Sequence, residues 1–152
     1  MTFEFGPEED GQREFVVSAG GNRSSFPVVI SLVDAAPSLP RWKLIKFRQR
    51  RELLGLIQVG TFSINLESVK CSLRVEGDKV GITLFFGESD LDETMRNQLG
   101  YLLLDSALGE YDVETFVGRI DFHPAKKKSN MERIPFRTLT KAFDTLIKSV
   151  TN

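Results

Sequence analysis

The sequence of 152 residues predicts an α+β protein with a mixed, mostly antiparallel sheet of about six strands and three helices in two layers. Three observations predict this class. Residues 91–108 form a long apolar stretch that a glycine ends, as a buried helix does. Residues 69–86 hold two β-rich runs around a short turn, and residues 139–150 repeat apolar positions at steps of three and four. The length is that of one ordinary domain, so residues 1–152 are assigned to a single domain.

Three elements are predicted for the first 48 residues: a strand from Arg13 to Ala19, a helix capped by Ser24 or Ser25, and a strand from Arg41 to Arg48. An exposed turn over residues 6–12, which itself follows a short strand, precedes them. The helix has a proline in its first turn, and its apolar residues share one face: Phe26, Val29, Ile30 and Val33. The strand–helix–strand connection is long enough for a parallel crossover, which would be right-handed.

The middle of the chain predicts a β-hairpin. Residues 50–60 are compatible with a helical turn or with part of a strand, and Thr61 to Leu66 is predicted to be extended. Val69 to Val75 and Lys79 to Phe86 are rich in β-formers and are joined by Glu76-Gly77-Asp78.

The long helix of residues 91–108 has recognisable signals at both ends. Asp90 is the predicted N-cap, with a glutamate three residues later as its capping-box partner. Gly109 stands where a left-handed C-cap residue is expected. Asp105 interrupts the apolar run. It faces solvent, bonds a nearby backbone group, or pairs with a basic residue such as Arg119.

The segment after Gly109 is predicted to be a strand because charged and apolar residues alternate over Asp112 to Thr115. The residues expected to face the core have odd numbers up to Val117 and even numbers from Ile120. A regular strand cannot keep both sets on one face. A bulge at Gly118-Arg119 restores the register, and two short strands with a turn at Gly118 are the alternative. A basic loop over residues 124–134 leads to the last helix.

Polar residues of this predicted strand form the first candidate site. Carboxylates two positions apart on a strand lie roughly 7 Å apart, which suits a general acid and base or a divalent ion. A small hydrolase or transferase is the function this indicates, and a solvated outer sheet face is the ordinary alternative. The candidate residues are Glu110, Asp112, Glu114, Arg119, Asp121 and His123.

A basic patch is the second candidate, and it consists of Arg41, Lys43, Lys46, Arg48, Arg50 and Arg51. Basic groups next to Trp42 and Phe47 can hold a nucleic-acid backbone and stack its bases. Two observations favour other roles. The aromatic residues are needed in the core, and lysines guard edge strands against aggregation. The net charge of −1 offers no general attraction for nucleic acid.

The turn from Ser18 to Ser25 is the third candidate, because backbone N–H groups at the start of a helix can bind phosphate or carboxylate. A turn with an ordinary N-cap is the alternative.

The residue inventory excludes several site types. The chain has one histidine, His123, and one cysteine, Cys71, so it cannot build a cysteine- or histidine-rich metal site by itself. No Walker, Gly-x-Gly-x-x-Gly or Gly-x-Ser-x-Gly sequence is present, and no metal or cofactor is expected. No apolar stretch reaches the ~20 residues of a membrane span, and the acidic start does not resemble a signal peptide. We therefore expect a cytoplasmic protein without membrane contact.

Two stretches, Leu39 to Arg48 and Leu102 to Glu114, resemble small bacterial proteins with no assigned activity. The resemblance covers about a third of the chain, implies a bacterial and cytosolic origin, and carries over no catalytic residue. Since no nucleophile–base pair, metal cluster or cofactor loop is visible, the sequence favours a non-catalytic module that binds another macromolecule, with protein as the first choice. It predicts neither the partner nor the oligomeric state.

Overall fold

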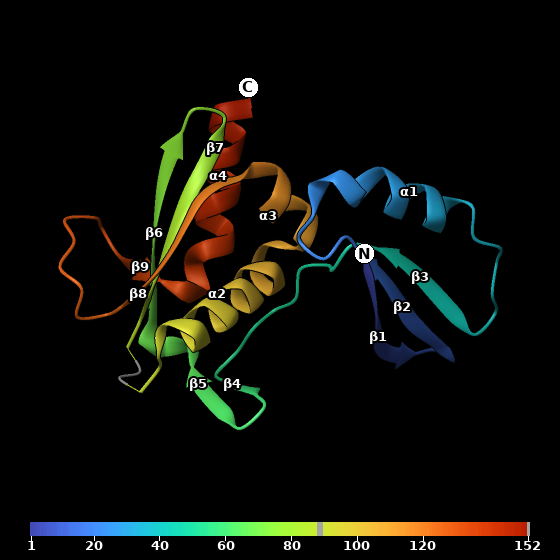
Figure 1. Ribbon diagram of the computed structural model, residues 1–152, viewed down its shortest axis with the longest axis horizontal. Helices are drawn as coiled ribbons and strands as arrows, with labels where there is room; N and C mark the ends of the chain where they lie inside the picture. Colours follow the sequence, from blue (N-terminus) through green and yellow to red (C-terminus); the bar gives the residue numbers. More distant parts are fainter. Residues whose placement is uncertain (88–89, 152) are drawn as a thin grey trace.

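The computed structural model describes residues 1–87 and 90–151, and it confirms the α+β class (Figure 1). The predicted arrangement is wrong in its details. Within these residues, nine strands form three separate sheets and four α-helices accompany them, where one mixed sheet of about six strands with three helices was expected. None of the helices among the described residues is long and apolar enough to cross a membrane.

The N-terminal lobe, residues 1–47, is a three-stranded sheet with one helix. The sheet has the order β1-β2-β3, with β1 and β2 antiparallel and β2 and β3 parallel. The predicted parallel crossover is thus confirmed. The elements are β1 (Thr2–Glu9), β2 (Gln12–Ser18), a 3₁₀ turn (Arg23–Ser25), α1 (Phe26–Asp34) and β3 (Trp42–Lys46).

The turn predicted over residues 6–12 is shorter in the structure, because β1 continues through Pro7 to Glu9. A register shift between Phe5 and Glu8 absorbs the proline, which lies on an edge strand where a missing N–H is tolerated. Ser25 precedes α1 without capping it through its side chain, whereas the Asn22 side chain accepts a hydrogen bond from the Ser24 N–H.

The C-terminal lobe, residues 53–151, contains the other two sheets. A small hairpin pairs β4 with β5, and a four-stranded sheet has the order β8-β7-β6-β9. The predicted hairpin of β6 and β7 is confirmed within one residue at its turn. The elements are β4 (Leu56–Val59), β5 (Phe62–Asn65), a 3₁₀ turn (Leu66–Ser68), β6 (Val69–Glu76), β7 (Lys79–Phe86), α2 (Glu93–Leu108), α3 (Glu110–Phe116), β8 (Val117–Pro124), β9 (Ile134–Pro135), a 3₁₀ turn (Phe136–Thr138) and α4 (Leu139–Thr151).

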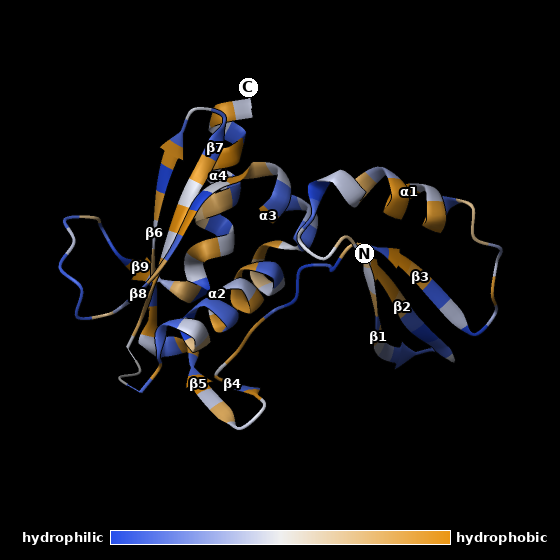
Figure 2. Cartoon of the chain, in the orientation of Figure 1, coloured by the Kyte–Doolittle hydropathy of each residue, from blue (hydrophilic) through white to orange (hydrophobic). Residues whose placement is uncertain are grey.

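Each lobe has its own hydrophobic core. The smaller core joins α1 to the sheet through residues such as Val17, Val29 and Phe47. The larger core lies between one face of the four-stranded sheet and α2 and α4 (Figure 2). At one point α2 approaches the sheet so closely that a Cβ on Gly100 would overlap the Phe122 ring. The assignment of the whole chain to one domain stays a prediction.

The prediction of a strand directly after Gly109 is wrong, because residues 110–116 form the helix α3. Gly109 ends α2 with φ of 82° and ψ of 146°, a conformation that essentially only glycine adopts, and redirects the chain. Glu110 and Val113 then lie three positions apart on the buried side of the new helix. The alternating charges of this segment are compatible with a short helix as well as with a strand, so the sequence alone could not distinguish a helix from a strand here.

Two smaller predictions have different outcomes. The bulge at Gly118-Arg119 is confirmed, because Val117 faces Val80 and Ile120 faces Ile82, which leaves one extra residue in β8. The cap predicted at Asp90 is wrong: Asp92 caps α2, and its Oδ1 accepts a hydrogen bond from the Met95 N–H at 2.8 Å.

Candidate functional site

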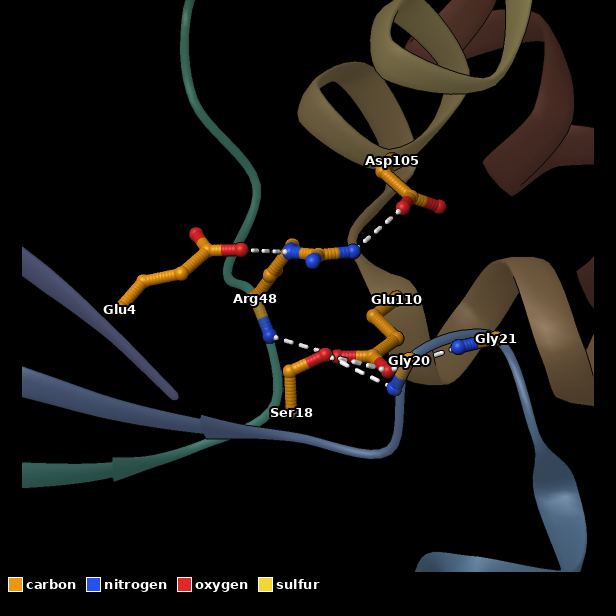
Figure 3. A network of polar contacts seen from close by, with 7 residues as sticks. All are labelled: Glu4, Ser18, Gly20, Gly21, Arg48, Asp105 and Glu110. Carbon is orange, nitrogen blue, oxygen red and sulfur yellow. Dashed lines mark hydrogen bonds and ion pairs between the residues drawn. The ribbon is translucent and has the colours of Figure 1, made fainter. Parts of the chain in front are cut away.

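The two lobes are joined around one buried carboxylate, that of Glu110 (Figure 3). Its Oε1 accepts hydrogen bonds from the Ser18 hydroxyl at 3.0 Å and from the Gly21 N–H at 3.4 Å. Its Oε2 accepts one from the Arg48 N–H at 3.1 Å, while the Glu110 N–H donates to the Arg48 carbonyl at 2.9 Å. Ser18 and Gly21 of the Ser18–Ser25 turn thus bind a carboxylate of α3 in the same chain, whereas binding of a phosphate or carboxylate by the N–H groups at the start of the helix stays a prediction.

We call the set of hydrogen bonds made by Glu110 the joint between the lobes. The Arg48 side chain forms two ion pairs beside this joint. Its Nε donates to Glu4 on β1 at 2.6 Å, and its Nη1 donates to Asp105 on α2 at 3.3 Å. Figure 3 shows the guanidinium group between the two carboxylates. Burial raises the pKa of Asp105 above its ordinary value, an effect that the Arg48 charge opposes. Asp105 thus pairs with a basic residue of the segment that connects the lobes, and not with Arg119.

The first candidate site is divided between two elements. Glu110, Asp112 and Glu114 lie on α3, whereas Arg119, Asp121 and His123 lie on β8. Asp112 forms an ion pair with Arg50 at 2.6 Å. Burial, followed by the charges of Asp105 and Glu110, raises the pKa of Glu114. Over the described ranges, no three His, Cys, Asp or Glu side chains are grouped so that they could hold a metal ion.

The β8 residues lie along a polar hollow of about 230 Å³ on the sheet face away from α2 and α4. Ser72, Thr83 and Asp121 form a row across β6, β7 and β8 because the strand register places them opposite one another. Asp121 is held by Arg119, with 2.7 Å between Oδ2 and Nε. Burial and the nearby Lys127 lower the pKa of His123, so its ring is neutral near pH 7. The hollow offers hydrogen bonds but no activated nucleophile.

The predicted basic patch is largely neutralised by carboxylates of the same chain. Lys46 pairs with Asp34 at 2.7 Å, and Arg50 pairs with both Asp112 and Asp144. Lys43 and Arg51 approach Glu14 at 3.9 and 3.8 Å. Together with the contacts of Arg48, these pairs leave Arg41 as the member without an ion pair in residues 1–87 and 90–151. The patch serves mainly to connect the lobes, since the Arg51 N–H and Arg50 Nε also donate to carbonyls of α2.

An aromatic surface on the N-terminal sheet was not singled out by the sequence. We define the aromatic face as Phe3, Phe5, Phe15, Leu39, Trp42 and Leu44. Phe5, Phe15 and Leu44 form one row across the three strands. The Phe3 and Phe15 rings stack with centroids 5.5 Å apart, and those of Phe5 and Trp42 lie 5.6 Å apart. These rings cover the part of the sheet face that α1 leaves open, next to the core residue Val17.

The aromatic face is exposed to a degree that folding alone does not explain. Phe3 is 63% exposed and Phe5 is 57% exposed. An apolar groove of about 320 Å³, almost without polar atoms, runs between Phe5, Phe15, Trp42 and Leu39. The alternation of Phe3 and Phe5 in the first strand was the available sequence signal. It pointed to one face of a strand but not to whether another element covers that face.

Comparison with known proteins finds no matching family model, no matching curated protein and no matching solved structure. The functional conclusion therefore depends on the geometry of the molecule itself.

Proposed function

We propose that this chain is a non-catalytic protein-binding module and that the aromatic face is its contact surface. The observation that carries the proposal is the cluster of three exposed aromatic rings, Phe3, Phe5 and Trp42, which pack with the half-buried Phe15 around an apolar groove. Contiguous exposed apolar surface costs free energy in water, and in folded proteins it marks interaction sites. Aromatic side chains are also the residues that contribute most to protein interfaces.

The distribution of exposed residues supports this choice of surface. Half of the large hydrophobic side chains that are exposed among the described residues fall in residues 1–42, which make up well under half of the chain. Trp42, Leu39 and the α1 residues Val28 and Leu32 are among them. The N-terminal lobe is thus the better candidate for a contact surface than the polar hollow on β8.

The proposed setting is the bacterial cytosol. The resemblance of residues 39–48 and 102–114 to small bacterial proteins supports it. The free thiol of Cys71, buried in the larger core on β6, fits a reducing compartment.

Photo-crosslinking tests the proposal. A benzophenone amino acid replaces Phe5 in the native cells, and the same amino acid replaces Phe62, an exposed phenylalanine on β5 outside the aromatic face, as the matched control. We expect a protein joined through position 5 and not through position 62. The purified partner should bind the Phe5→Ser variant about tenfold or more weakly than the wild type and the Phe62→Ser variant normally. Equal binding to all three would contradict the proposal.

A further inference from the structure

The apolar groove does not stand alone, because a second hollow adjoins it. This hollow, of about 350 Å³, is lined by Glu8, Gly11, Arg13, Arg41 and Trp42. Trp42 lines both spaces, so an apolar hollow and a charged one meet at this residue. Any ligand long enough to cross Trp42 meets both chemistries.

The lining of the second hollow has more basic than acidic side chains. Arg13 and Arg41 are both exposed, and neither forms an ion pair with any residue in the described part of the chain. This separates them from the neighbouring lysines and arginines, whose charges are already paired with carboxylates. Glu8 offsets one of the two charges, which leaves the lining of this hollow with one net positive charge; Glu9 and Asp10 do not line it. Guanidinium groups without partners favour carboxylate or phosphate, which they bind in a planar, two-point geometry.

We propose that the aromatic face binds an extended peptide segment of the partner, with an aromatic or leucine side chain in the groove and an aspartate or glutamate on Arg13 and Arg41. This inference rests on the proposed protein-binding function and adds the chemistry of the bound segment. Charge complementarity carries it, since Arg13 and Arg41, which form no ion pair among the described residues, line a hollow that shares Trp42 with the apolar groove.

The strand register fixes the spacing of this motif. Arg13 lies directly opposite Trp42, and Phe15 lies opposite Leu44 two positions further along the same strands. Two positions on a strand span roughly 7 Å. An extended peptide therefore carries its apolar anchor and its acidic residue about two positions apart.

Acidic side chains near the same end disfavour a nucleic acid as the occupant. Glu8 and Glu9 end β1, with Glu8 directly opposite Arg13, Asp10 begins the turn to β2, and the net charge of the chain is −1. A phosphate backbone needs several unneutralised cations along its length, whereas a single carboxylate needs only one or two.

Selection from a phage library of random peptides of about 12 residues tests the inference. The wild-type protein should enrich peptides in which Asp or Glu stands about two residues from Phe, Trp, Tyr or Leu. The Arg13→Glu/Arg41→Glu variant should bind these peptides about tenfold or more weakly and should itself select Lys or Arg at the acidic position. The Lys126→Glu/Lys128→Glu variant carries the same charge change on an exposed loop of the other lobe and should behave as the wild type.

The outcomes separate the two proposals. Peptides that lose affinity for the Phe5→Ser variant but bind the Arg13→Glu/Arg41→Glu variant normally would overturn the acidic motif and leave the proposed function standing. A failure to enrich any peptide, or binding unaffected by Phe5→Ser, would overturn both. If the charge reversal unfolds the lobe, Arg13→Gln/Arg41→Gln replaces it, with the same loss of affinity expected. Single-stranded DNA that displaces the peptide, or a stable dimer that buries Trp42, would overturn a peptide as the occupant.

Discussion

The carboxylate of Glu110 on α3 and the hydroxyl of Ser18 at the end of β2 are joined by a buried hydrogen bond of 3.0 Å, although 92 residues separate them in the chain. The Ser18 side chain has a second hydrogen bond, because its Oγ accepts from the Gly20 N–H at 2.9 Å. The bond therefore connects the turn that leads into α1 with the C-terminal lobe. It fixes the orientation of the sheet that carries the aromatic face.

Replacing Glu110 with alanine should destabilise the protein by at least about 2 kcal/mol, because the buried Ser18 hydroxyl and the partly buried Arg48 N–H would both lose their acceptor. Glu110→Gln should cost less, since the amide keeps one oxygen acceptor. Urea unfolding measures both values. Glu52→Ala, at an exposed glutamate of the connecting segment, is the control and should change the free energy of unfolding by less than about 0.5 kcal/mol. A Glu110→Ala variant as stable as that control would contradict the structural role of the joint.

The two acidic residues with raised pKa near the joint predict a pH dependence. Asp105 and Glu114 are both shifted upward, mainly by burial, from ordinary values of 3.8 and 4.5. A carboxyl group with a raised pKa in the folded state contributes stability that is full below its unfolded pKa and is lost as the pH rises through the folded pKa. Wild-type stability should therefore fall relative to Asp105→Asn/Glu114→Gln as the pH rises above these ordinary values. Urea unfolding at pH values from about 4 to about 7 checks this. Parallel profiles for the two proteins would show that these groups are not shifted.

The close approach of α2 to β8 predicts that Gly100 cannot carry a side chain. The Cβ of an alanine would overlap the Phe122 ring, which is itself packed against Phe86 and Tyr101. Gly100→Ala should lower the free energy of unfolding by about 2 kcal/mol, despite the better helix propensity of alanine. Asn97→Ala, at an exposed position of the same helix, should stay within about 0.5 kcal/mol of the wild type when both are unfolded thermally. A Gly100→Ala variant that is as stable as the wild type, or more stable, would contradict the close packing of α2 against Phe122.

Local patterns were sufficient for most of the elements. The β6–β7 hairpin, α2, α4, the parallel crossover and the bulge in β8 follow from periodicity and turn residues. The separation into three sheets was not predictable, because which strands pair depends on contacts between distant segments. The identity of α3 was not predictable either, since the short alternating run from Asp112 to Thr115 is compatible with a short helix and with a strand.

The candidate residues show the same limit. Glu110 was found by its charge, but its burial among the Ser18 hydroxyl and the backbone N–H groups of Gly21 and Arg48 depends on distant parts of the chain. Arg41 to Arg51 were correctly seen as a basic run, yet their carboxylate partners come from β1, β2, α1, α2, α3 and α4. Sequence spacing shows which charges are near one another along the chain and not which of them are neutralised in the fold.

Fluorescence of Trp42 tests the central claim most directly, because it is the only tryptophan of the chain and it lines both hollows of the proposed contact surface. Titration with a peptide selected on the wild-type protein should shift its emission to shorter wavelength in a saturable way, as the ring leaves water. The Phe5→Ser variant should lose the shift at the same peptide concentrations, and the Phe62→Ser variant should keep it. Saturable binding of the peptide that leaves Trp42 emission unchanged would place the contact surface elsewhere on the protein and contradict the account.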